Sequence, residues 1–157
     1  MATGSVLATK YAREATPKDS TGNYAIPKMI PGGLNELIPS LYFADSGDSA
    51  DFPLVMPAYY DAGGLTAKIY WTDATTTGAT FRIGFRRYDA SITATHSYSF
   101  QSVVASALGG ANEIGTAEIS FTDGQIDGFL AGESGSFRLD INSAVDAWVL
   151  AVVLTED

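Results

Sequence analysis

Hydrophobic and polar residues alternate with a period of two through much of the chain after Leu41. This period places successive side chains on opposite faces of a β-strand. The clearest segments with this pattern are 65–71, 81–86, 117–121 and 136–141. Turn-forming residues separate them, and such a series of short half-buried strands is typical of an all-β sandwich or barrel.

The apolar positions of these segments define the predicted core. They are Leu65, Ala67, Ile69, Trp71, Phe81, Ile83, Phe85, Ala117, Ile119, Phe121, Phe137, Leu139 and Ile141. The turn-rich link DATTTGA predicts that segments 65–72 and 80–86 form an antiparallel hairpin. The last segment, 147–154 (AWVLAVVL), is apolar on both sides. We expect a strand that is covered on both faces, or one whose second face meets another subunit.

Helix is scarce in this pattern. The best candidate is 100–108 (FQSVVASAL), which ends at Gly109 and Gly110, but the β-branched Val103 and Val104 leave a strand possible. Segment 121–131 (FTDGQIDGFLA) contains two Asp-Gly pairs. It predicts a turn with one helical turn before the strand at Phe137.

Residues 1–40 differ from the rest, because they carry few apolar pairs at strand or helix spacing and many prolines and glycines. We expect an extended N-terminal arm over 1–40 and a β domain over 41–157. A terminus without fixed structure is the alternative. An ordered arm needs a surface to lie on, and its candidate contact residues are Lys10, Tyr11, Arg13, Lys18, Tyr24, Ile26, Lys28, Met29 and Ile30.

Length and charge narrow the function classes. At 157 residues the chain can bury one core but not two large domains. Its net charge of −9 would repel phosphate backbones, so nucleic acid is not an expected partner. No apolar run reaches the length that spans a bilayer and the N-terminus shows no leader pattern, so we expect a soluble, unsecreted chain.

Catalytic and cofactor signatures are weak. The chain has no cysteine, and its one histidine, His96, lies outside any G-x-S-x-G elbow, so no nucleophilic triad is predicted. Paired carboxylates for glycoside hydrolysis could be chosen from 18 acids, which makes that hypothesis uninformative. Asp45, Asp48 and Asp51 could offer oxygen ligands to calcium, but their spacing is not that of an EF-hand and favours a solvated turn. We therefore predict no enzyme, cofactor or metal.

Aromatic and arginine residues offer binding surfaces instead. Tyr59 and Tyr60 fall in a predicted loop and could stack on a sugar, whereas Trp71 and Trp148 lie in apolar strand contexts that favour the core. Arg82 and Arg86 share one strand face. In an acidic protein they should meet carboxylates of this subunit or of another.

Two stretches resemble a jelly-roll module of tailed-bacteriophage structural proteins. The first is LYFADSGDSADFPLVMPAYYDAGGLTAKIYWTDATTTGATFRIGFRRYD, in which an acidic loop precedes an M-P-x-x-Y-D-x-G-G-L-T turn and an IYWT strand. The matching residues are Met56, Pro57, Tyr60, Asp61, Gly63, Gly64, Leu65, Thr66, Ile69, Tyr70, Trp71 and Thr72. The second is ISFTDGQIDGFLAGESGSFRLDI, in which Phe137, Arg138 and Leu139 match an F-R-L strand. The resemblance covers residues 41–157.

This resemblance implies an antiparallel jelly-roll β-sandwich in a virion. The expected function is a non-enzymatic capsid decoration (cement) protein on the outer surface of a phage head, made in the host cytoplasm. Its expected partners are the major capsid protein and copies of itself in a homotrimer. The N-terminal arm would bind the shell, and Tyr59, Tyr60, Arg82 and Arg86 are further interface candidates. The alternative is a receptor- or glycan-binding module of a tail or head fibre.

Overall fold

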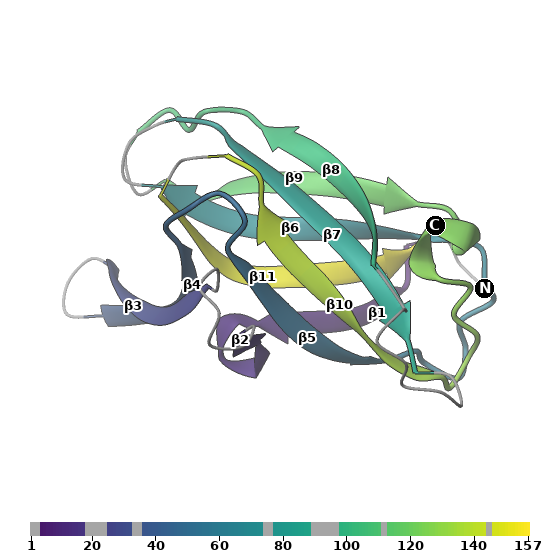
Figure 1. Ribbon diagram of the computed structural model, residues 1–157. Coiled ribbons are helices and arrows are strands. Elements are labelled where there is room, and N and C mark those ends of the chain that lie inside the picture. Colours follow the sequence, from purple (N-terminus) through teal and green to yellow (C-terminus); the bar gives the residue numbers. More distant parts are fainter. Residues whose placement is uncertain are drawn as a thin grey trace.

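Antiparallel strands make up most of the protein, a computed structural model of which describes residues 4–17, 25–32, 36–73, 77–88, 98–110, 113–143 and 146–157. The strands within these ranges are β1 (Val6–Tyr11), β2 (Thr16–Pro17), β3 (Ile26–Gly32), β4 (Glu36–Phe43), β5 (Ser49–Val55), β6 (Leu65–Asp73), β7 (Ala79–Arg87), β8 (Ser99–Ala105), β9 (Gly115–Phe121), β10 (Ser134–Ile141) and β11 (Ala147–Glu156). Two 3₁₀ helices accompany them, η1 (Ala12–Glu14) and η2 (Asp123–Ile126). Figure 1 shows the strands stacked in two layers.

The strands form two sheets. One has the order β3-β4-β11-β6-β9, and β1 also pairs with β11. The other has the order β2-β5-β10-β7-β8. All pairings are antiparallel among the described strands. The predicted fold class, an all-β jelly-roll sandwich, is confirmed.

The core lies between the sheets and uses the alternation predicted from the sequence. Trp71 of β6 is fully buried and meets Phe81 of β7 edge-on, with ring centroids 5.4 Å apart. Phe85 likewise meets Phe121 of the opposite sheet at 5.0 Å. All the residues predicted for the inward faces are 5% exposed or less. Period-two alternation was therefore sufficient to predict which side of each strand is buried.

The predicted hairpin between segments 65–72 and 80–86 is wrong. β6 pairs with β11 and β9, whereas β7 pairs with β10 and β8. The link therefore crosses from one sheet to the other, and the two strands face each other across the core. Alternation fixes a buried face for each strand, but it does not say which strand provides the neighbouring hydrogen bonds.

Segment 100–108 is not a helix, because Ser99–Ala105 forms β8 at the edge of its sheet. The β-branched Val103 and Val104 favour the extended state. The predicted helical turn after Phe121 is confirmed as η2. Asp127 ends that helix in the left-handed conformation (φ 64°), followed by Gly128 (φ 60°), so the Asp-Gly pair acts as the stop signal.

Val6–Tyr11 and Thr16–Pro17 are extended, as predicted for the arm, but they pair with strands of this chain's own sandwich, and η1 lies between them. β1 runs antiparallel along β11, with Leu7 and Ala12 buried in the core. β2 then pairs with β5 of the second sheet. The arm prediction missed this because a strand can be held by backbone hydrogen bonds with few apolar side chains of its own. Beyond it, β3 pairs with β4, and this pair projects past the sandwich in Figure 1.

Candidate functional site

A groove of about 710 Å³ crosses the outer face of the six-stranded sheet. It lies where two strands follow each other along one edge of β11: β4 pairs with Ala147–Val149, and β1 pairs with the stretch from Ala151 to Thr155. The described residues that line it are Thr9, Tyr11, Arg13, Ile38, Pro39, Tyr70, Ile114, Leu150, Ala151 and Val153. Its size falls in the range of small-ligand sites.

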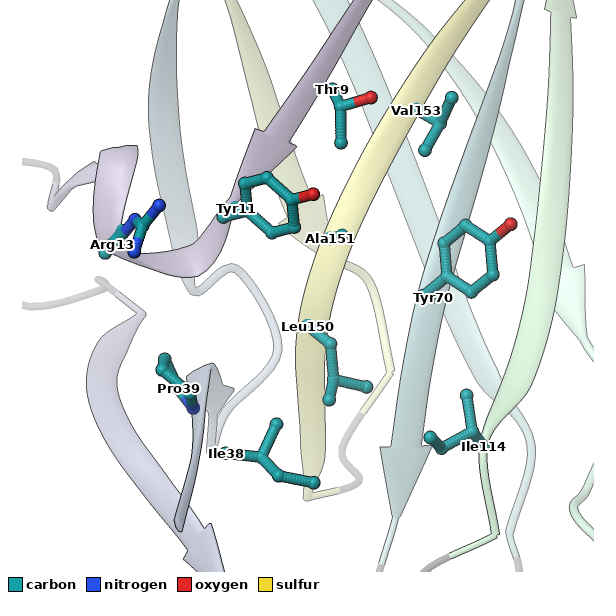
Figure 2. Close-up of a pocket in the computed structure, with 10 residues that line it drawn as sticks. All are labelled: Thr9, Tyr11, Arg13, Ile38, Pro39, Tyr70, Ile114, Leu150, Ala151 and Val153. Atoms are coloured by element: carbon teal, nitrogen blue, oxygen red, sulfur yellow. The ribbon is translucent and has the colours of Figure 1, made fainter. Parts of the chain in front are cut away.

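Two tyrosines dominate the floor of the groove. Tyr11 of β1 and Tyr70 of β6 are both direct cross-strand partners of Ala151 on β11. Adjacent strands lie about 4.8 Å apart, so the Cα atoms of the two tyrosines are about 9.6 Å apart. The methyl group of Ala151 lies between them. Figure 2 shows the two rings flanking β11, with Ala151 between them. We call these three residues the Tyr11–Ala151–Tyr70 platform.

A bulge in β11 supplies the apolar part of the floor. The register with β6 shifts between Val149 and Ala151, so Leu150 and Ala151 are both half-buried on the outer side of the sheet. The side chain of Val153 stands one pleat further along the same face. This accounts for the last strand being apolar on both sides, since its outer residues line the groove.

Polar groups stand at the rim. The Arg13 guanidinium carbon is 5.7 Å from the centroid of the Tyr11 ring, within range of a cation–π contact. On the far side, Lys68 Nζ lies 6.0 Å from the Tyr70 centroid and 2.8 Å from Glu118 Oε1. The hydrogen bond to Glu118 raises the pKa of Lys68, so the ammonium group stays charged at neutral pH. The hydroxyl of Thr9 completes a site with apolar faces and hydrogen-bonding edges.

The loop tyrosines predicted to stack on a sugar lie outside this groove. Tyr60 is 4% exposed, so its ring lies in the core, and burial raises the pKa of its hydroxyl. An interface role for Tyr60 therefore does not fit the structure. Tyr59 is 45% exposed, and its hydroxyl donates a hydrogen bond to the Val6 carbonyl at 2.8 Å. Trp71 is buried as predicted, and Trp148 packs on Tyr42 with centroids 5.0 Å apart.

The other predicted interface residues are dispersed. Lys10 is 3.7 Å from Glu14, Ile26 is exposed on β3, and Lys28 Nζ lies 3.5 Å from the centroid of Tyr42. Lys18, Tyr24 and His96 lie outside the described residues, as does the side chain of Met29. Of the predicted interface residues, Tyr11 and Arg13 are the two that lie together in the groove. Tyr70 of β6 was not among the predicted interface residues, although it lines the groove.

The acidic residues Asp45, Asp48 and Asp51 do not form one site, because Asp48 and Asp51 have different partners. Asp48 accepts hydrogen bonds from the backbone amides of Ala44 and Asp45, and Asp51 pairs with Arg138 of β10. Across the described ranges no cluster of three histidine, cysteine or acidic residues is placed to hold a metal. Nor does any helix in them have the length and apolarity to cross a membrane.

Comparisons with known proteins agree on the fold. The chain is similar to carbohydrate-binding module CBM6cm-2 of Cellvibrio mixtus lichenase 5A, solved with cellotriose, at a TM-score of 0.62 and 13% identity over 97% of this chain and 98% of that one. It is also similar to CsCBM6-3 of Clostridium stercorarium, solved with cellobiose. The TM-score is 0.62 and the identity 13%, over 99% of this chain and 98% of that one. A third similar structure is the C-terminal CBM6 of LamC from Zobellia galactanivorans, with a TM-score of 0.60 and 12% identity over 95% of this chain and 98% of that one.

No family model and no curated protein matches the sequence. At these identities the structural likeness defines the fold class, a jelly-roll β-sandwich of the kind that carbohydrate-binding modules use. It does not carry ligand or site over to this chain.

Proposed function

We propose that this protein is a non-catalytic carbohydrate-binding module, with the Tyr11–Ala151–Tyr70 platform as its binding surface. The observation that carries the proposal is the register: two tyrosines stand opposite the same small residue on the outer face of one sheet. The similarity to carbohydrate-binding modules over nearly the whole chain supports it.

The platform suits the chemistry of a saccharide. The two faces of a pyranose ring carry C–H groups that pack on an aromatic face, and its rim carries hydroxyls that need hydrogen-bond partners. Two rings rooted about 9.6 Å apart offer a surface on the scale of a disaccharide or longer. The Thr9 hydroxyl, the tyrosine hydroxyls and the Arg13 guanidinium line the same groove and offer hydrogen-bond partners to sugar hydroxyls.

The lining also favours binding over hydrolysis. Glycoside hydrolysis requires two carboxyl groups on either side of the scissile bond. None of the described lining residues carries a carboxylate. We therefore propose that an oligosaccharide is held on this face and released unchanged.

Capsid decoration, trimerisation and a virion location rest on the sequence resemblance alone and remain predictions. Within the predicted arm, Val6–Tyr11 and Thr16–Pro17 pair with strands of this chain's own sheets. Glycan binding, the alternative, has both the fold and a groove in its favour.

The test is binding of defined neutral oligosaccharides to the whole chain by isothermal titration calorimetry. The first panel consists of cellotriose, xylotriose and β-1,3-galactotriose. Each is titrated into the wild-type protein and into the double variant Tyr11→Ala, Tyr70→Ala. We expect at least one ligand to bind wild type and not the double variant. Ligand binding that survives in the double variant would place the site elsewhere, and no binding across a wider neutral panel would overturn the proposal.

A further inference from the structure

A second surface, on the outer face of the five-stranded sheet, carries a repeated pairing of arginine and aspartate across neighbouring strands. Arg82 of β7 stands opposite Asp140 of β10 and makes two hydrogen bonds to it, Nε to Oδ1 at 2.7 Å and Nη2 to Oδ2 at 2.9 Å. Arg138 of β10 stands opposite Asp51 of β5 and repeats the geometry at 2.6 and 2.7 Å. Each guanidinium thus has its carboxylate in the directly opposite position.

Aromatic rings hold these two arginines in place. The guanidinium carbon of Arg138 lies 4.6 Å from the centroid of Tyr98, and that of Arg82 lies 5.2 Å from Phe100. The two rings lie over Gly84, where a Cβ would come within 2.8 Å of Tyr98 Cβ and 3.1 Å of the Phe100 ring. Glycine at this position lets the rings lie close to the sheet.

Arg86 breaks the pattern. It belongs to the same outward row of β7 as Arg82, but the residue opposite it on β10 is Ser136 rather than aspartate. Among the described residues no carboxylate pairs with Arg86, although the other two arginines on this face are both paired with two hydrogen bonds each. Partial burial removes water from the guanidinium of Arg86, and no carboxylate of the described residues replaces it. A bound anion would compensate for this loss of solvation.

A cavity of about 370 Å³ lies at this position. Besides Arg86, its lining includes Thr16, Ser136 and Tyr98, which carry hydroxyls, the apolar Phe52 and Pro53, and Tyr88, which is 52% exposed. Ser136 Oγ and Tyr98 Oη are 2.9 Å apart and share a hydrogen bond. Asp51 also lines the cavity, but its charge is matched by Arg138, which leaves one net positive charge among the described lining residues.

We propose that Arg86 and the cavity beside Ser136 form a carboxylate-binding site for an acidic sugar, a hexuronate unit. The guanidinium would take the carboxylate in the place that aspartate fills in the other two pairs. The hydroxyls of Ser136 and Thr16 and the exposed Tyr88 ring would take the sugar hydroxyls and one sugar face. The sugar part of this proposal rests on the proposed carbohydrate-binding function, whereas the carboxylate part rests on Arg86 alone.

The sharpest variant is Ser136→Asp, because it would supply Arg86 with the same partner that Arg82 and Arg138 already have. It should fold as well as wild type, since Tyr98 can donate its hydrogen bond to the new carboxylate. Arg86→Gln removes the charge and keeps most of the side chain. Lys10→Gln is the matched control, because it removes one positive charge from the other sheet.

The measurement is NMR titration of each variant with methyl glucuronide at fixed ionic strength, followed at the amides around Arg86 and Ser136. We expect Ser136→Asp and Arg86→Gln to weaken binding about tenfold or more, and Lys10→Gln to leave it unchanged. Wild-type affinity in both site variants would overturn the proposal. Loss in Arg86→Gln together with full retention in Ser136→Asp would also overturn it, because the aspartate should compete for the same guanidinium.

Two comparison ligands separate the parts of the proposal. Methyl glucoside should not bind at this site, and sodium acetate should bind at least tenfold more weakly than methyl glucuronide. Acetate or a glutamate-containing dipeptide binding as tightly as the glucuronide would overturn the assignment to sugars. In the double variant Tyr11→Ala, Tyr70→Ala the glucuronide should still bind, so failure of the groove and failure of this site are distinguishable.

Discussion

Truncating Tyr11 is the most informative single change to the groove. The side chain is 50% exposed, and an aromatic residue of this kind has about 150–250 Å² to bury, so a ligand lying on the ring can cover up to about 75–125 Å². At about 25 cal/mol per Å² this amounts to about 2–3 kcal/mol. Tyr11→Ala should therefore weaken oligosaccharide binding by about 30- to 150-fold.

Stability should change little, because the exposed ring contributes little to the core and the Tyr11 amide keeps its hydrogen bond to Glu14 at 2.7 Å. The assay is calorimetric titration with whichever neutral trisaccharide binds wild type, with urea unfolding of each variant alongside. Tyr59→Ala is the matched control, since Tyr59 is 45% exposed but lies outside the groove. Equal losses of affinity in the two variants, or a larger loss in Tyr59→Ala, would refute the reasoning.

Three further predictions concern stability. Asp51→Asn should lower the free energy of unfolding by about 1–3 kcal/mol in a urea titration, because Arg138 loses the carboxylate that raises the pKa of its guanidinium; an unchanged midpoint would contradict this. Gly84→Ala should cost about 1–3 kcal/mol, because the new methyl group would lie 2.8 Å from Tyr98 Cβ, and thermal unfolding at or above the wild-type temperature would count against that packing. Burial raises the pKa of Tyr60 and Tyr98, so the unfolded chain loses these protons first; the contribution of these two groups to stability should be constant below about pH 10 and be lost as pH rises above it, with a smaller fall in Tyr98→Phe than in wild type.

The sequence was sufficient for the faces of the strands but not for their neighbours. Alternation correctly placed Trp71 and Phe81 in the core, because the side-chain period of a strand is independent of what it pairs with. Pairing depends on contacts between distant segments, which is why 65–72 and 80–86 were wrongly joined in a hairpin. The same limit applies to β1, whose place beside β11 is set by backbone hydrogen bonds that leave no hydrophobic signature.

The candidate site could be predicted only in fragments. Tyr11 and Arg13 were singled out, but as contacts of an arm with another subunit. Tyr70 sits at an outward position of a strand, and nothing in the local pattern says that Tyr11 of β1 stands two strands away, on the other side of β11. At Arg86 the informative feature is Ser136 in the place of an aspartate, which becomes visible only once the register of β7 with β10 is known.

The measurement that tests the central claim most directly is chemical-shift mapping of the whole chain with a neutral trisaccharide panel that begins with cellotriose. We expect the amides of Tyr11, Ala151 and Tyr70 to shift together with one dissociation constant, while Tyr59 and the five-stranded sheet stay unchanged. Shifts confined to the loop around Tyr59, or a panel of neutral oligosaccharides that shifts no residue, would contradict it.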